Sequence, residues 1–169
     1  MIISAIVIGL FLLPSVKDTL AQFPQSSIKD QNIVSLNSNN AIFNANTTEF
    51  LGIKNMSLTP YLVTEGHYID HGILKNVGNV TNNKTFTNTY LSDELLIGRG
   101  KGTIETTDEQ SIDWISSDLG RLSDNQWVFQ GVMLFNNTQG ESLSFLNNRI
   151  GLYSSTAGVN DPEYIWLLE

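Results

Sequence analysis

Apolar and polar residues alternate along most of the chain after Phe50, without the stripe of an amphipathic helix. Between clusters of turn-forming residues the apolar positions recur every second residue, which is the period of a half-buried β-strand. Nine candidate strands follow from this pattern: residues 50–58, 61–69, 72–81, 83–91, 94–106, 110–121, 126–136, 148–155 and 163–169. The pattern therefore predicts an all-β domain.

The links between these candidate strands are short and rich in turn formers. They include Asn82-Asn83, Thr107 to Glu109 and Ser123 to Asn125, with a short helical turn expected near Leu143 to Asn147. A parallel crossover needs about a dozen or more residues, so links of this length indicate antiparallel hairpins. We predict an antiparallel up-and-down β-barrel of about eight strands over residues 50–169.

The stretch GRGKG at residues 98–102 resembles a phosphate-binding loop, but its surroundings predict a different role. Phosphate loops lead into a helix whose N-terminus faces the phosphate, whereas here the chain continues as strand, turn and strand. Gly98, Gly100 and Gly102 would share one face of a strand, with Arg99 and Lys101 on the other. A row of inward glycines suits the strong coiling of a small closed barrel, with bulky neighbours filling the space.

Two neighbouring strands supply those bulky side chains on one face each. Every second position from Ile112 to Leu122 and from Trp127 to Phe135 falls on one face, and these faces carry Ile112, Trp114, Leu122, Trp127, Phe129, Met133 and Phe135. If these faces line a barrel, the candidate ligand-binding residues are Trp114, Asp118, Trp127, Phe129 and Phe135. The opposite face of 126–136 carries Val128, Val132 and Leu134, which predicts a contact with a second copy of the chain.

Asp118 is the sharpest candidate for chemistry, because the alternation places it on the inner face with Trp114. A buried carboxylate must find a partner or shift its pKa upward. It would then anchor a ligand or act as a general acid or base, with Arg121 or Arg149 as a partner. The alternatives are a structural ion pair, or a bulge near Ser116-Ser117 that turns Asp118 outward.

Other chemical signatures are weak. The stretch HYIDH at 67–71 resembles a zinc motif, but that motif needs a helix, and on a strand His67 and His71 would lie about 13 Å apart. We interpret them as a surface pair. There is no G-x-S-x-G nucleophile elbow. We assign no catalytic residue, no metal and no cofactor.

The N-terminal region predicts export. Residues 1–21 combine an uncharged apolar run, too short to span a bilayer that needs about 20 residues, with a small-x-small step ending at Ala21, as in a signal peptide. The run lacks a preceding Lys or Arg, so an uncleaved anchor and a buried apolar strand are the alternatives. Residues 22–49 are rich in Asn and Ser and are interpreted as a flexible tether. We therefore predict a secreted or extracytoplasmic protein, or a membrane-anchored one if the N-terminal segment is not cleaved. Glycosylation sequons occur at Asn46, Asn55, Asn79, Asn83 and Asn136.

Charge and cysteine content limit the possible functions and the means of stabilising the fold. The formal net charge of -8 and the scattered basic residues argue against nucleic-acid binding, which needs Lys and Arg against phosphates. The chain has no cysteine, so an exported domain would be held together by its core rather than by disulfides.

The motifs GRGKGTIETTDEQSIDWISSDLGRL, WVFQGVMLF, LSFLNNRIGLY and YIWLLE together resemble the barrel-like family related to allene oxide cyclase and dirigent proteins. The resemblance implies a β-barrel over about Gly72 to Glu169, and the family's catalytic residues find no match here. It leaves three function classes: a barrel that binds a small amphiphilic, apolar or aromatic ligand, a cofactor-independent cyclase or coupling enzyme, and a structural or cell-surface interaction protein.

Overall fold

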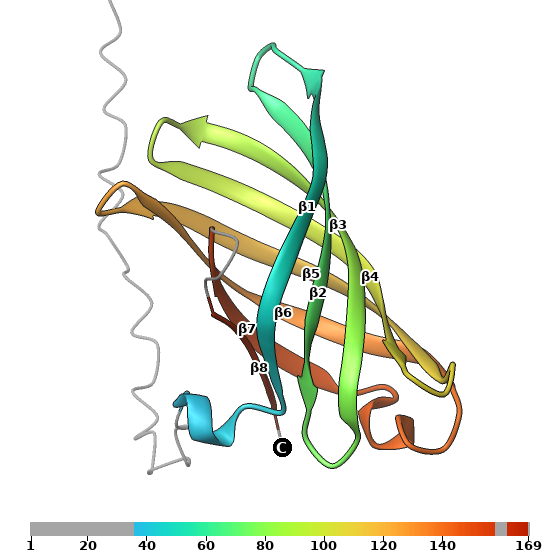
Figure 1. Cartoon of the computed structure of the whole chain (residues 1–169). Helices are drawn as coiled ribbons and strands as arrows, with labels where there is room; N and C mark the ends of the chain where they lie inside the picture. Colours follow the sequence, from blue (N-terminus) through green and yellow to red (C-terminus); the bar gives the residue numbers. More distant parts are fainter. Residues whose placement is uncertain (1–35, 158–161, 169) are drawn as a thin grey trace, which may run out of the picture. The chain divides into compact units, whose positions relative to one another are not determined.

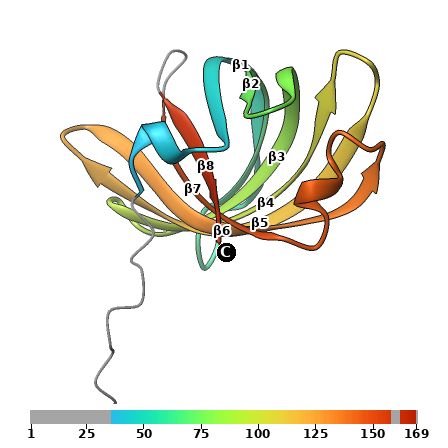
Figure 2. The ribbon, with the colours of Figure 1, turned by 90° about the horizontal axis from the view of Figure 1, so that it is seen from below.

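The protein is an eight-stranded antiparallel β-barrel in the computed structural model, which describes residues 36–157 and 162–168. Each strand pairs with its neighbours in the sequence, and β1 also pairs with β8 to close the sheet, as Figures 1 and 2 show. The elements are η1 (Ser38–Asn40), β1 (Phe43–Ser57), β2 (Val63–Leu74), β3 (Gly78–Ser92), β4 (Leu95–Thr106), β5 (Ser111–Ser123), β6 (Gln126–Gln139), η2 (Ser144–Leu146), β7 (Ile150–Thr156) and β8 (Glu163–Leu167). The predicted all-β, up-and-down architecture is confirmed.

The barrel begins earlier than the composition predicts. β1 starts at Phe43, so residues 43–49, which were assigned to the tether, form part of the barrel wall. The reason is that Phe43 and Ala45 are buried at alternate positions, and the backbone of this segment pairs with β2. The expected signal peptide at 1–21 and residues 22–35 of the expected tether lie outside the described residues.

The turn predicted at Asn82-Asn83 is wrong, because both residues lie in the middle of β3. The chain turns instead between β2 and β3 at residues 75–77, where Asn76 has a φ of 67°. Asn82 is fully buried, and its side chain hydrogen-bonds to Asp70 and Trp114. A buried asparagine whose side-chain hydrogen bonds are all made is tolerated inside a sheet. The three candidate strands 61–69, 72–81 and 83–91 therefore correspond to only two strands, β2 and β3.

One end of the barrel is filled by an apolar core. The core gathers where β1 begins and where β2–β3, β4–β5 and β6–β7 are connected, and it includes Leu143 and Leu146 from the loop around η2. Its other buried members are Phe43, Ala45, Leu74, Val80, Ile104, Ile112, Trp114, Met133, Phe135, Tyr153 and Ile165. The opposite end, which carries the β1–β2, β3–β4 and β5–β6 hairpins, is free of this packing.

The glycines of β4 make room for side chains from the neighbouring strands. A Cβ on Gly98 would overlap the carboxylate of Asp118, and one on Gly102 would lie 2.6 Å from the indole of Trp114. A Cβ on Gly100 would meet the ring of Phe86 at 2.5 Å. The glycine row is therefore a packing feature of the barrel interior.

The wall has a seam between its first and last strands. β1 pairs with β8 through only Phe43 with Ile165 and Asn44 with Tyr164, whereas it pairs with β2 along its whole length. Among the described residues, those of β1 after Asn44 therefore pair with no residue of β8. Within the described part of the chain, no helix has the length and apolar character to cross a membrane.

Candidate functional site

A cavity of about 340 Å³ occupies the half of the barrel that the core leaves free. Its walls come from β1, β2, β3, β6, β7 and β8, so it spans the seam between β1 and the last two strands. The lining residues are Thr48, Phe50, Tyr68, Lys84, Phe86, Asn88, Phe129, Tyr153, Ser155, Thr156, Ala157 and Glu163. Phe50 is 56 % exposed, so the cavity opens to solvent on this side.

Aromatic rings form most of the apolar wall. Neighbouring rings lie at centroid distances of 5.4 Å for Phe50 and Tyr68, 6.5 Å for Tyr68 and Phe86, and 6.4 Å for Phe86 and Tyr153. Phe129 adds a further ring from β6 and stacks on Trp127 at 6.3 Å. These distances are typical of favourable aromatic pairs, so the rings stabilise one another along this wall.

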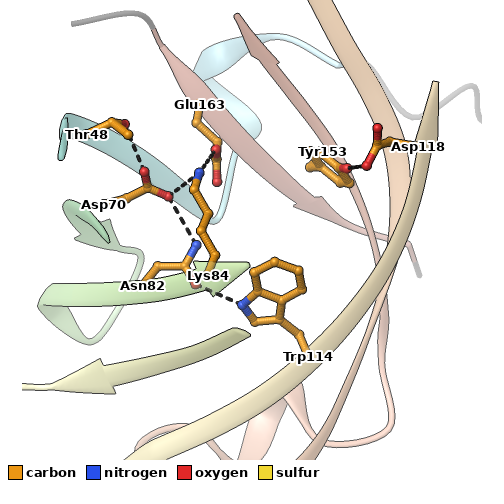
Figure 3. Close-up of polar contacts among 8 residues, drawn as sticks. All are labelled: Thr48, Asp70, Asn82, Lys84, Trp114, Asp118, Tyr153 and Glu163. Carbon is orange, nitrogen blue, oxygen red and sulfur yellow. Dashed lines mark hydrogen bonds and ion pairs between the residues drawn. The ribbon is translucent and has the colours of Figure 1, made fainter. Parts of the chain in front are cut away.

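The polar part of the wall is a buried ion cluster. The Lys84 ammonium on β3 lies 2.6 Å from the Asp70 carboxylate on β2 and also contacts the Glu163 carboxylate on β8. Figure 3 shows Lys84 reaching between the two carboxylates. Lys84 and Glu163 line the cavity, while Asp70 lies behind them.

Two further hydrogen bonds hold Asp70 directly, and a third supports it through Asn82. Thr48 Oγ1 donates to one of its oxygens at 2.8 Å, and Asn82 Nδ2 donates to the other at 3.2 Å. Asn82 in turn accepts a bond of 2.8 Å from the indole Nε1 of Trp114. Because each member is satisfied, the cluster is rigid, which is the condition under which a buried polar network is tolerated.

The charges of this cluster depend on each other. Burial opposes the charge of Lys84, but the Glu163 and Asp70 carboxylates outweigh this effect and hold the Lys84 pKa above its ordinary value. Burial raises the pKa of Glu163 to about 7, although Lys84 acts in the opposite direction. Glu163 is therefore a carboxyl group that gains or loses its proton near neutral pH at the wall of a cavity.

A second polar pair lies across the barrel, where the Tyr153 hydroxyl donates to Oδ2 of Asp118 (Figure 3). Burial raises the pKa of Asp118, and the hydrogen bond from Tyr153 opposes this shift. The other oxygen, Oδ1, is buried without a hydrogen-bond partner and faces Gly98. Tyr153 lines the cavity and Asp118 lies outside its lining.

No protein-family model, curated protein or solved structure matches the chain. The function must therefore be argued from the geometry of the cavity itself.

The structure separates the five residues that the sequence proposed as one site. Phe129 lines the cavity, and Trp127 stacks on Phe129 without being part of the lining. Trp114 and Phe135 are fully buried in the core, and Asp118 is buried behind Tyr153. Arg121 and Arg149, the proposed partners of Asp118, are both exposed, whereas Asp118 is buried and accepts its hydrogen bond from Tyr153.

Sequence reasoning missed the ion cluster. Lys84 was hidden by the turn placed at Asn82-Asn83, and Asp70 was considered only as part of HYIDH. The signal was present in β3, where Thr81, Asn83, Thr85, Thr87 and Thr89 alternate with Asn82, Lys84, Phe86 and Asn88. That alternation is typical of one continuous strand with Lys84 on its inner face.

The two histidines point away from this cluster, on the outer face of β2. His67 contacts Thr85 at 3.0 Å and Glu65 at 3.4 Å, while His71 contacts Glu49 at 2.8 Å. The described residues contain no group of three His, Cys, Asp or Glu side chains that could hold a metal ion.

Proposed function

We propose that the barrel is a binding module for a small ligand with an apolar or aromatic body and one polar group. The observation that carries this proposal is the cavity of about 340 Å³, with aromatic walls and a charged cluster on one side. Small-molecule sites are usually concave, mostly apolar, and supplied with a few polar groups that orient the ligand. Its volume lies near the lower end of the usual range of about 300 to 1,000 Å³, which favours a small ligand.

The resemblance to the allene oxide cyclase and dirigent barrels supports the same type of ligand. In those proteins the barrel holds an apolar or aromatic compound without a cofactor. The sequence motifs that carry this resemblance lie on β4 to β8, which include the Phe129 and Tyr153 walls. The expected export of the chain would place this module outside the cytoplasm.

A cavity-filling variant tests the proposal. Ser155 lines the cavity, and Ser154 lies next to it on the opposite face of β7, so Ser155→Phe and Ser154→Phe form a matched pair. A screen of small amphiphiles and aromatic compounds should give ligands that raise the melting temperature and change tryptophan fluorescence. These effects should disappear in Ser155→Phe and persist in Ser154→Phe. If no compound in the screen changes either signal, or if both variants respond equally, the proposal fails.

Acid–base catalysis on the bound ligand is a second candidate function. The observation in its favour is Glu163, whose pKa of about 7 suits proton transfer at neutral pH and which lines the cavity. A screen ligand that is converted by the wild-type protein and left intact by Glu163→Gln would support it. Ligands recovered unchanged from the wild-type protein would contradict it and leave the binding function standing.

A further inference from the structure

The barrel interior holds more negative than positive ionisable groups. Among the described residues, the buried ionisable carboxyl groups are Asp70, Asp118 and Glu163, and the buried cationic group is Lys84. Asp118 is bound to Tyr153 on the far side and is separate from the cluster. The imbalance at the cavity therefore lies between one ammonium and the two carboxyl groups of Asp70 and Glu163.

Lys84 neutralises only one of its two partners. Its ammonium lies 2.6 Å from Asp70 and contacts Glu163, so the cluster carries one net negative charge when both carboxyl groups are ionised. An unpaired buried charge is costly unless a proton or another cation balances it. Without a ligand, Glu163 takes up a proton for this purpose, since its pKa is about 7. A cation placed in the cavity would do the same without the proton.

The cavity wall suits a cation as well as an apolar body. The rings of Phe50, Tyr68, Phe86 and Tyr153 form a continuous arc, and aromatic faces attract cations through their quadrupole. One ring of this arc already faces an ammonium, because Lys84 Nζ lies 5.8 Å from the centroid of Phe86.

We propose that the ligand is an amine, with its ammonium beside Glu163 and its apolar body against the aromatic arc. This inference rests on the proposed binding function and names the ligand class. An anionic head group is the disfavoured alternative, because it would add a third negative charge beside Asp70 and Glu163. The ammonium of Lys84 is already bound to both of these carboxylates and gives such a ligand little compensation.

Three probes of similar shape separate these cases: phenethylamine, phenethyl alcohol and phenylpropanoate, each titrated into the full-length protein by calorimetry. The amine should bind tightest and the carboxylate weakest. Glu163→Gln should weaken amine binding by about tenfold or more, as expected for loss of a charged partner, and should leave alcohol binding nearly unchanged. This variant keeps the Lys84–Asp70 pair, so the cluster remains neutral and the fold is retained. Glu94→Gln, on the exposed β3–β4 turn, removes the same charge outside the barrel and should change neither affinity.

The pH dependence gives a second readout. Glu163 on β8 interacts with Lys84 from β3, Asp70 from β2 and Tyr153 from β7, and the Thr48 hydroxyl on β1 bonds to Asp70 behind it. Burial raises the pKa of Glu163 to about 7, while the pKa values of Lys84 and Tyr153 are both held above their ordinary values. Amine affinity should therefore rise as the pH increases through about 7 and then level off, and alcohol affinity should stay flat.

The outcomes distinguish the inference from the proposed function. If the alcohol or the carboxylate binds as tightly as the amine, or if Glu163→Gln leaves amine affinity intact, the amine assignment is overturned and the binding function stands. If none of the three probes binds and the broader amphiphile screen is also negative, the binding function fails and the inference fails with it.

Discussion

The Lys84 ammonium on β3 lies 2.6 Å from the Asp70 carboxylate on β2, inside a barrel wall where both side chains are buried. The two strands are neighbours, so the pair joins them across the interior as well as through their backbones. With Glu163 attached to the same ammonium, β8 is tied to this pair across the seam. The cluster is thus both part of the candidate site and a structural link.

Removing the ammonium should destabilise the fold strongly. In Lys84→Met the Asp70 and Glu163 carboxyl groups are left together without a cation, and breaking a buried ion pair from one side costs about 3–5 kcal/mol. Urea denaturation should show a loss of that order in the free energy of unfolding. Lys101→Met, on the exposed face of β4, is the control and should change it little. A loss in Lys84→Met no greater than in the control would contradict the structural role.

Stability should decline as the pH rises from about 4.5 to about 7. The folded state raises the pKa of Glu163 from an ordinary 4.5 to about 7, so within this window the folded chain holds a proton that the unfolded chain releases. The contribution is therefore fully present below the lower value and lost above the upper one. Asp118, whose pKa is also raised, acts in the same direction. Melting temperatures across this range should fall less in Glu163→Gln than in Glu94→Gln, and equal declines would refute the assignment.

Gly98 and Asp118 should be energetically coupled. A Cβ at position 98 overlaps the Asp118 carboxylate, so Gly98→Ala should destabilise the barrel by about 1–3 kcal/mol through overpacking. The same change made in an Asp118→Ala background meets an alanine in place of the carboxylate and should cost clearly less. A double-mutant cycle in urea measures this difference. Additive effects would show that the two positions do not share the space.

The outer face of the barrel should mediate self-association. Ile115 on β5 pairs with Leu134 on β6, which pairs with Ile150 on β7, and these three side chains are 55 %, 40 % and 49 % exposed. Val132, also exposed, extends this row, and a contiguous apolar surface of this kind favours an interface. Analytical ultracentrifugation should show an oligomer that Leu134→Lys converts to monomer. Asn83→Lys, on the exposed outer face of β3, should leave it intact, and a monomeric wild-type protein would remove the basis for this contact.

The period-two pattern predicted the barrel wall well where the two faces differ clearly. On β4 and β5 it placed Gly98, Gly102, Trp114 and Asp118 inside, and each is found there. The reason is that strand geometry turns every second side chain inward, so a single sequence is enough to assign the faces.

The candidate site was beyond this reasoning because it depends on pairing between distant strands. Asp70 and Glu163 are brought together only when the ring closes, and each one alone looks like a surface acid in the sequence. The turn placed at Asn82-Asn83 added to the error, since propensity favours turns at asparagine and tertiary hydrogen bonds to Asp70 and Trp114 override it here. A continuous strand through Lys84 would have revealed one member of the cluster.

If the cavity binds a ligand, the seam between β1 and β8 should govern how fast that ligand enters and leaves. Two residue pairs close the ring, and immediately above them the facing sides of the cavity come from Thr48 and Phe50 on β1 and from Ser155 on β7. Local opening in proteins occurs first where few backbone bonds must break, so these strands should part more often than any others in the wall. The residence time of a bound molecule would then depend on how often the two strands separate and on the width of the molecule. Two ligands of equal Kd but different width would dissociate at different rates.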